Sequence, residues 1–197
     1  MQKRKRGGSV PLGPRFRRAL SYAARIHARQ FRKGTTRPYI AHLLGVTATV
    51  LTHGGDEEEA IAALLHDAVE DQGGEARLRD VRRKFGARVA KIVEGCTDSY
   101  GDEKPPWLER KKQYLRHLRK ANASVRLVSA ADKLYNAREV LMDLQKRGAE
   151  VWSRFKGGKN GTLWYYQQVA KILRDDGNPE LVSELSRVVR ELRKASK

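Results

Sequence analysis

Apolar residues recur at helical spacing along almost the whole chain after residue 13. In residues 16–31, FRRALSYAARIHARQF, the side chains of Phe16, Leu20, Ala23 and His27 fall on one stripe of a helix. We find no segment in which apolar and polar residues alternate between hairpin turns, the pattern that predicts strands. The spacing therefore predicts an all-α fold.

The same spacing divides the chain into separate helical segments. Helices are predicted over residues 16–31, 40–53, 57–71, 76–86, 87–97, 106–121, 124–147, 162–176 and 179–195. Asp56 is the expected N-cap of the third segment, because it precedes three acidic residues and an apolar run. A chain of 197 residues suits one domain with a full core. We therefore expect a single domain of about eight to ten helices over residues 14–197, preceded by a flexible basic tail over residues 1–13.

The charge of the chain limits its partners. Lys and Arg number 41 against 23 Asp and Glu, a formal net charge of +18, which favours polyanions or multiply phosphorylated molecules. No apolar run approaches the roughly 20 residues that a membrane span needs, and no hydrophobic stretch of a secretory signal follows the basic start. The single cysteine, Cys96, excludes an internal disulfide and suits a reducing compartment. We expect a cytoplasmic protein with an anionic partner and no membrane contact, and the sequence makes no prediction of oligomeric state.

The run AIAALLHDAVED, residues 60–71, places four polar groups at the end of an apolar helix. Residues i and i+4 stack along one helix face, so His66 is expected over Glu70, and Asp67 over Asp71. Apolar residues before them suggest that this polar end opens into a cleft. The alternative is that HDAVED is a solvated C-terminal turn.

Two positions far from residues 60–71 in the sequence supply a further histidine and a further aspartate. His42 follows RPYIA on an apolar segment, and Asp132 follows the apolar run RLVSAA. Each has a structural alternative: His42 as a hydrogen-bonded core residue, and Asp132 as the ion-pair partner of Lys133. Taken with His66 and Asp67, however, they form a nitrogen and oxygen ligand set that suits Mn²⁺, Fe²⁺ or Zn²⁺.

This H…HD…D pattern resembles that of the HD-domain metal-dependent phosphohydrolases. The segments ARQFRKGTTRPYIAH, AALLHDAVED, KFGARVAKIVEGCTD, WLERKKQYL and ADKLYNAR come in the same order, at similar spacings, as in the small alarmone hydrolases. They also resemble the hydrolase half of the bifunctional Rel/Spo enzymes, and the likeness covers about residues 16–175. The resemblance implies removal of the 3′-pyrophosphate from guanosine tetra- or pentaphosphate, usually with Mn²⁺.

The resemblance also implies a role for each matching residue. The implied metal ligands are His42, His66, Asp67 and Asp132. The groups that would handle the attacking water are Glu70 and Asp71. The base would be held by Arg32 and Lys33, and the ribose and phosphates by Lys133 and Asn136.

Several residues fall outside these motifs. Lys156 and Lys159 flank a pair of glycines, so their loop is a candidate phosphate-binding segment. A solvated loop is the alternative. His27, His53 and His117 lack partners at useful spacing, and no role is predicted for them.

Two departures from the family pattern leave other substrates open. The family commonly has PYINHP where this chain reads PYIAHL, and the segment RFKGGKNGTLWYYQQVAKIL also differs. Adenosine equivalents or another nucleotide therefore remain alternatives, as does a role as antitoxin to an alarmone synthetase. A rival of another class is a basic helical module that binds nucleic acid through its positive surface.

Overall fold

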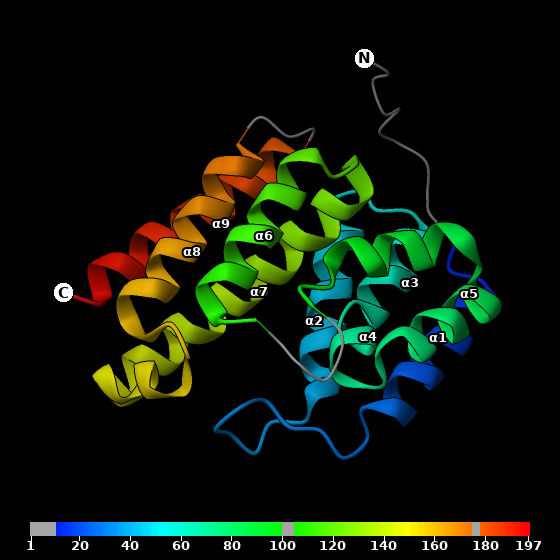
Figure 1. Cartoon of the computed structure of the whole chain (residues 1–197), viewed down its shortest axis with the longest axis horizontal. Coiled ribbons are helices and arrows are strands. Elements are labelled where there is room, and N and C mark those ends of the chain that lie inside the picture. The colour runs from blue at the N-terminus through cyan, green and yellow to red at the C-terminus, as the bar shows by residue number, and fades with distance from the viewer. Residues whose placement is uncertain (1–10, 100–104, 175–177) are drawn as a thin grey trace.

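Figure 1 shows the computed structural model of the chain, in which residues 11–99, 105–174 and 178–197 are described. Of the predicted basic tail, residues 1–10 lie outside the described part. The helices in the described ranges are α1 Pro14–Ile26, α2 Tyr39–Thr52, α3 Glu57–Leu65, α4 Ala68–Asp71, α5 Gly74–Cys96, α6 Trp107–Lys120, α7 Ala123–Arg147, the 3-10 helix η1 Gly148–Arg154, α8 Gly158–Leu173 and α9 Pro179–Ala195.

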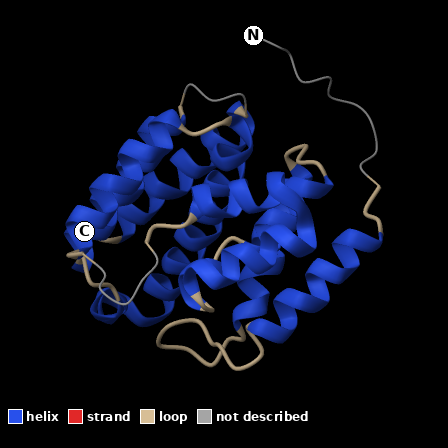
Figure 2. Ribbon diagram, turned by 45° about the vertical axis from the view of Figure 1, so that its right-hand side comes forward, coloured by secondary structure: helices blue, strands red, loops and turns tan. Residues whose placement is uncertain are grey.

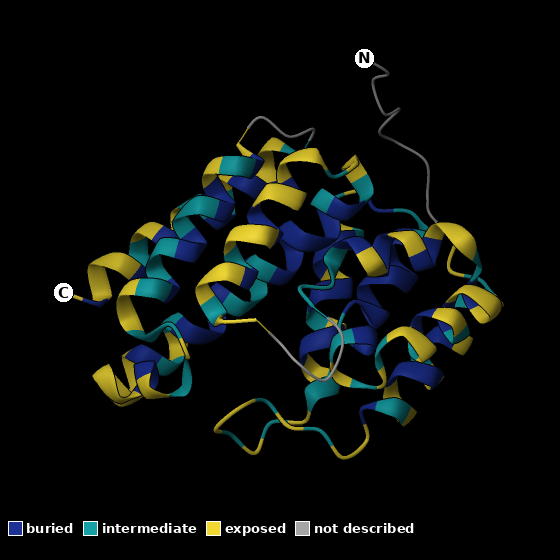
Figure 3. Cartoon of the chain, in the orientation of Figure 1, coloured by how far each residue is buried: buried dark blue, intermediate teal, exposed yellow. Residues whose placement is uncertain are grey.

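The prediction of an all-α fold is confirmed (Figure 2). Across the described ranges, extended pairing is limited to one isolated bridge between Phe31 and Pro38. Helix α7 lies between α8 and α9 at one end of the molecule and α1 to α5 at the other (Figure 1). The buried residues line the faces where these helices meet (Figure 3). No helix in the described residues is long and apolar enough to cross a membrane.

Helix α3 runs through the core and carries the first part of the polar cluster. The predicted cap is confirmed: Asp56 Oδ1 accepts from the Glu59 amide at 2.9 Å, and Glu59 Oε2 accepts from the Asp56 amide at 2.9 Å. This reciprocal pair satisfies two of the free amides at the helix start. Glu59 is fully buried, and its Oε1 accepts from Ser124 Oγ of α7 at 2.7 Å. The start of α3 is therefore fixed against α7.

The predicted boundary at Gly86 is also confirmed. Helix α5 is bent there, and Gly86 has φ 89° and ψ 167°, a conformation that is essentially restricted to glycine. The bend lets the two halves of α5 pack against α3, α4 and α7 in different directions.

The prediction of one continuous helix over residues 57–71 is wrong. Helix α3 ends at Leu65, a turn contains His66 and Asp67, and the short helix α4 begins at Ala68. His66 Nδ1 donates to the Ala63 carbonyl at 2.8 Å. Asp67 has φ −95° and ψ −1°, in the sparsely populated region where many active-site residues lie. The break changes where the polar side chains of HDAVED point.

The segment between α1 and α2 folds as a compact loop. Helix α1 ends at Ile26, earlier than the predicted residue 31. The Arg32 amide donates to the Arg37 carbonyl, and the Tyr39 amide to the Gln30 carbonyl, each at 2.9 Å. These bonds hold the loop in a reversal that returns the chain to the start of α2.

Candidate functional site

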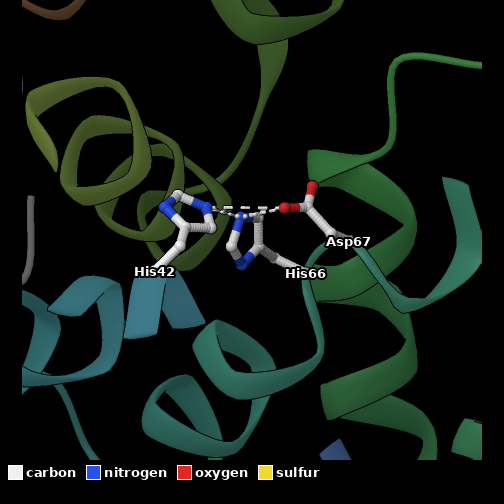
Figure 4. A group of neighbouring side chains, drawn as sticks. All are labelled: His42, His66 and Asp67. Carbon is white, nitrogen blue, oxygen red and sulfur yellow. Dashed lines mark hydrogen bonds and ion pairs between the residues drawn. The ribbon is translucent and has the colours of Figure 1, made fainter. Parts of the chain in front are cut away.

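Side chains from three separate segments converge at the C-terminal end of α3. His42 comes from α2, His66 and Asp67 from the turn after α3, and Asp132 from α7. His66 Nε2 lies 3.0 Å from Asp67 Oδ2 and 3.2 Å from His42 Nε2. Asp132 Oδ1 lies 3.3 Å from His42 Nε2 and 3.5 Å from His66 Nε2. Figure 4 shows three of these side chains, His42, His66 and Asp67, pointing toward one another.

The chemistry of this cluster fits a divalent cation. Because His66 Nδ1 donates to the Ala63 carbonyl, its Nε2 is free to act as a ligand toward the cluster. Burial opposes a proton on His66, but the charges of Asp67 and Asp132 outweigh burial and raise the pKa of His66 well above its usual value. The surroundings therefore stabilise a positive charge at the centre of the cluster. The ligand atoms of His42, His66 and Asp67 all lie within 4.8 Å of one another, a composition and spacing that fit a divalent cation.

Both carboxylates are oriented by neighbouring groups. The Tyr39 hydroxyl donates to Asp67 Oδ2 at 2.6 Å, and Asn136 Nδ2 donates to Asp132 Oδ1 at 2.5 Å. The second oxygen of Asp132 is paired with Lys133. Asp132 therefore does both things that the sequence analysis gave as alternatives: it pairs with Lys133, and it lies in the cluster with His42 and His66. Partners of this kind fix the direction of metal-binding carboxylates.

Beside the cluster lies a cavity of about 460 Å³. Tyr39, Lys133 and Asn136, which contact the carboxylates of the cluster, form part of its wall, and Asp71 lines it as well. The cations that line the cavity are Arg32, Lys33, Arg37, Lys111, Lys133 and Arg154. Because these outnumber the carboxylates of the same wall, the cavity suits an anionic ligand.

Arg32 lies on the cavity wall, held by several contacts. Its Nη2 is 2.6 Å from Glu139 Oε2 and donates to Asn136 Oδ1 at 2.5 Å. Its guanidinium lies 5.4 Å from the centre of the Tyr39 ring. Arg32 is thus linked to the His/Asp cluster through Asn136, which bonds to Asp132. The neighbouring Lys33 is exposed at the cavity.

The cavity contains residues to which the sequence analysis gave no role. Arg37 lies 3.2 Å from Glu139 Oε1 and 2.6 Å from Asp143 Oδ2, and Arg154 Nη2 donates to the same oxygen of Asp143 at 2.8 Å. These ion pairs tie the loop after α1 to α7 and η1. The 3-10 helix η1 was not predicted, and no periodic pattern in the sequence points to Arg154.

Lys111 is the third cation of the cavity wall, after Arg37 and Arg154, to which the sequence analysis gave no role. Its Nζ is 2.7 Å from Asp98 Oδ2 and 4.8 Å from the centre of the Tyr165 ring. Burial lowers the pKa of Lys111 and the charge of Lys133 lowers it further, while Asp98 opposes both. A phosphate between the two ammonium groups would relieve their repulsion. In the sequence, Lys111 follows Trp107 by four residues, so the two side chains lie on one face of the helix, and Trp107 also lines the cavity.

Of the other four residues predicted for the site, one lines the cavity and three do not. Asp71 lines the cavity, and Glu70 is half-buried near enough for its charge to act on Lys111. Lys156 and Lys159 are exposed and do not line the cavity, whereas the adjacent Arg154 and Phe155 do.

Comparison with known proteins, by sequence and by structure, gives the HD-domain family that the sequence motifs predicted. The HD domain family model matches residues 19–163. The guanosine-3′,5′-bis(diphosphate) 3′-pyrophosphohydrolase MESH1 of Danio rerio is 41% identical over 140 residues, which cover 68% of this chain and 71% of that protein. MESH1 of Homo sapiens is 38% identical over 162 residues, or 79% of this chain and 81% of that protein.

Solved structures agree with these relatives. A metazoan ortholog of SpoT, described as hydrolyzing ppGpp, has a TM-score of 0.75 and 27% identity, covering 96% of this chain and all of that one (100%). A protein of Listeria monocytogenes EGD-e has a TM-score of 0.68 and 32% identity, covering 78% of this chain and 99% of that one. Since the family model spans most of the chain and the MESH1 proteins align over more than two thirds of it, the chain belongs to the HD-domain family, among the hydrolases related to MESH1.

Proposed function

We propose that this protein is a metal-dependent hydrolase that removes the 3′-pyrophosphate of guanosine tetra- or pentaphosphate. The observation that carries the proposal is the His/Asp cluster next to a cavity with six lining cations: Arg32, Lys33, Arg37, Lys111, Lys133 and Arg154. A tetraphosphate nucleotide has the charge that such a cavity favours. The relation to proteins named as 3′-pyrophosphohydrolases supports this choice of reaction. The single cysteine fits a reducing compartment, and a cytoplasmic location is part of the same proposal.

In this proposal the ion is Mn²⁺, and its ligands are His42, His66, Asp67 and Asp132. A bound divalent ion supplies Lewis-acid activation of water and offsets charge on a phosphate. The distances of 3.0 to 3.5 Å between Nε2 and carboxylate oxygens support this ligand set. The absence of any cysteine from the set agrees with a preference for harder ions than those chosen by thiolates.

The proton transfers are assigned to Glu70 and Asp71. Water attacks the phosphorus attached to the ribose 3′ oxygen, and the bond between that phosphorus and the 3′ oxygen breaks. One water proton goes to a carboxylate of this pair, the pair passes a proton to the 3′ oxygen, and the remaining OH of the water becomes part of the pyrophosphate that leaves. The place of Asp71 in the cavity wall supports its part in this step.

The cations of the cavity hold the substrate. We assign Lys133 and Asn136 to the ribose and the 3′ phosphates, since both contact Asp132 and line the cavity. Arg32 and Lys33 are assigned to the base. Lys156 and Lys159 lie outside the cavity wall, so they can bind a phosphate of the substrate only if their loop moves.

Removal of two metal ligands tests the ion site. The double variant His66→Ala/Asp67→Ala should lose the divalent ion while remaining folded, because the ligands bind the ion together. The Asn136→Ala variant should lose only about 10–100-fold in metal affinity, since it removes a partner of one ligand. Metal analysis after dialysis, with circular dichroism as a check of folding, measures both. A double variant that keeps wild-type metal affinity would show that the ion is bound elsewhere.

Substitution of the two carboxylates beyond the metal ligands tests the proton-transfer step. Glu70→Gln and Asp71→Asn preserve side-chain shape, so the ion should stay bound. The turnover number should fall by roughly 10²–10⁴-fold for the residue that acts as the base. Single-turnover kinetics with Mn²⁺ measures this loss. If both variants lost the ion and recovered full activity in excess Mn²⁺, the carboxylates would belong to the metal ligands instead.

Product analysis tests the reaction itself. With Mn²⁺, the protein should release pyrophosphate and GDP from guanosine tetraphosphate, and pyrophosphate and GTP from the pentaphosphate. Anion-exchange separation identifies the products, with the adenosine equivalents, plain dNTPs and nucleoside monophosphates run in parallel. Triphosphate released from dNTPs, or phosphate released from monophosphates, would assign the protein to a different HD-domain reaction. Tight binding of RNA or DNA without any turnover would favour the nucleic-acid-binding alternative.

A further inference from the structure

The buried histidine at the end of α1 has no part in the reaction as described so far. His27 is 2% exposed and lies under the loop that lines the cavity. Its ring stacks on that of Tyr39, with centroids 5.3 Å apart and planes 17° apart. Burial lowers the pKa of His27, although its hydrogen bond to Gln30 opposes this, so the ring is neutral near pH 7 and carries one N–H donor.

That donor fixes the amide of Gln30. The Gln30 Oε1 atom lies 2.6 Å from His27 Nδ1 and accepts from Gln72 Nε2 at 2.6 Å. With two donors at its oxygen, the amide has one orientation in which all of its bonds are satisfied. Because the Asp71 carboxylate only accepts, Gln30 Nε2 faces Asp71 and Gln30 Oε1 faces His27, which assigns the proton of His27 to Nδ1. In this orientation Gln30 Nε2 faces away from His27, and it donates to Asp71 Oδ2 at 2.7 Å.

The stacked ring supports the metal site as well. Tyr39 rests on His27 and donates its hydroxyl proton to Asp67 Oδ2 at 2.6 Å. Burial and the charges of Asp67 and Asp71 raise the pKa of Tyr39, so the hydroxyl stays protonated and keeps donating. One buried imidazole thus contacts the two side chains that orient Asp67 and Asp71.

We propose that His27 is a positioning residue that aligns Asp71 for proton transfer through the amide of Gln30. The inference rests on the proposed function, because it takes Asp71 as a group that handles the attacking water. The bond from Gln30 holds Oδ2 of Asp71 and thereby sets the direction of the carboxylate in the cavity wall. A misplacement of about 1 Å at such a group can cost about 10²-fold in rate.

The test separates the hydrogen bond from the packing. His27→Phe keeps a ring under Tyr39 but removes the donor, whereas His27→Asn retains a donor near the position of Nδ1. Gln30→Leu breaks the same chain at its next link, and His117→Phe on the exposed face of α6 is the matched control. The variants are assayed as the full chain with Mn²⁺ and guanosine tetraphosphate.

His27→Phe should lower kcat by about 10–100-fold with little change in KM or metal content, and His27→Asn should recover much of that loss. Because His27 acts through Gln30, the double variant His27→Phe/Gln30→Leu should be no slower than Gln30→Leu alone. His117→Phe should match the wild type. A wild-type kcat in His27→Phe, or losses that multiply in the double variant, would overturn the proposal.

A second measurement does not depend on turnover. In the protein without Mn²⁺ and substrate, the side-chain amide protons of Gln30 should give one ordered pair of NMR signals, which His27→Phe broadens or shifts and His27→Asn preserves. Unchanged signals in His27→Phe would show that His27 does not orient Gln30. A wild-type protein that fails to hydrolyse guanosine tetraphosphate would overturn the proposed function instead, while the NMR result still decides the contact between His27 and Gln30.

Discussion

Adjacent residues on an α-helix point about 100° apart, so neighbours in the sequence cannot face the same ion from a continuous helix. His66 and Asp67 are such neighbours, yet His66 Nε2 and Asp67 Oδ2 lie 3.0 Å apart. The chain achieves this by ending α3 at Leu65 and holding the turn with the bond from His66 Nδ1 to the Ala63 carbonyl. Helix α3 brings this turn into the core, and α2 and α7 place His42 and Asp132 beside it.

The cationic side chains that line the cavity are also held in place, by ion pairs with acidic residues. Glu139 and Asp143 hold Arg32, Arg37 and Arg154 along one wall. Lys111 and Lys133 are held by Asp98 and Asp132. The acids therefore orient the cations of the cavity, which retains an excess of positive charge for a phosphorylated ligand.

Much of the fold could be predicted from the sequence because its determinants are local. Apolar spacing predicted the helices, the acid-rich start after Asp56 predicted the N-cap of α3, and Gly86 predicted the boundary at which α5 bends. The family resemblance, which the comparisons confirm, brought His42, His66, Asp67 and Asp132 into one expected set. Their convergence in the structure agrees with that expectation.

What the sequence did not predict depends on contacts between distant segments. The break after Leu65 allows two adjacent side chains to face one centre, and helical periodicity carries no sign of it. Arg154 reaches the cavity through Asp143, and His27 reaches Asp71 through Gln30. His27 was given no role although its partner Gln30 follows only three residues later, because the onward bond from Gln30 to Asp71 joins residues 41 positions apart and depends on the tertiary fold.

The proposed function depends most directly on where the ion binds. A crystal structure of the protein grown with Mn²⁺, with diffraction data collected at the manganese absorption edge, locates the ion by its anomalous signal. We expect one strong peak within ligand distance of four atoms: His42 Nε2, His66 Nε2, Asp67 Oδ2 and Asp132 Oδ1. A fully occupied peak elsewhere, with these four atoms left uncoordinated, would contradict it.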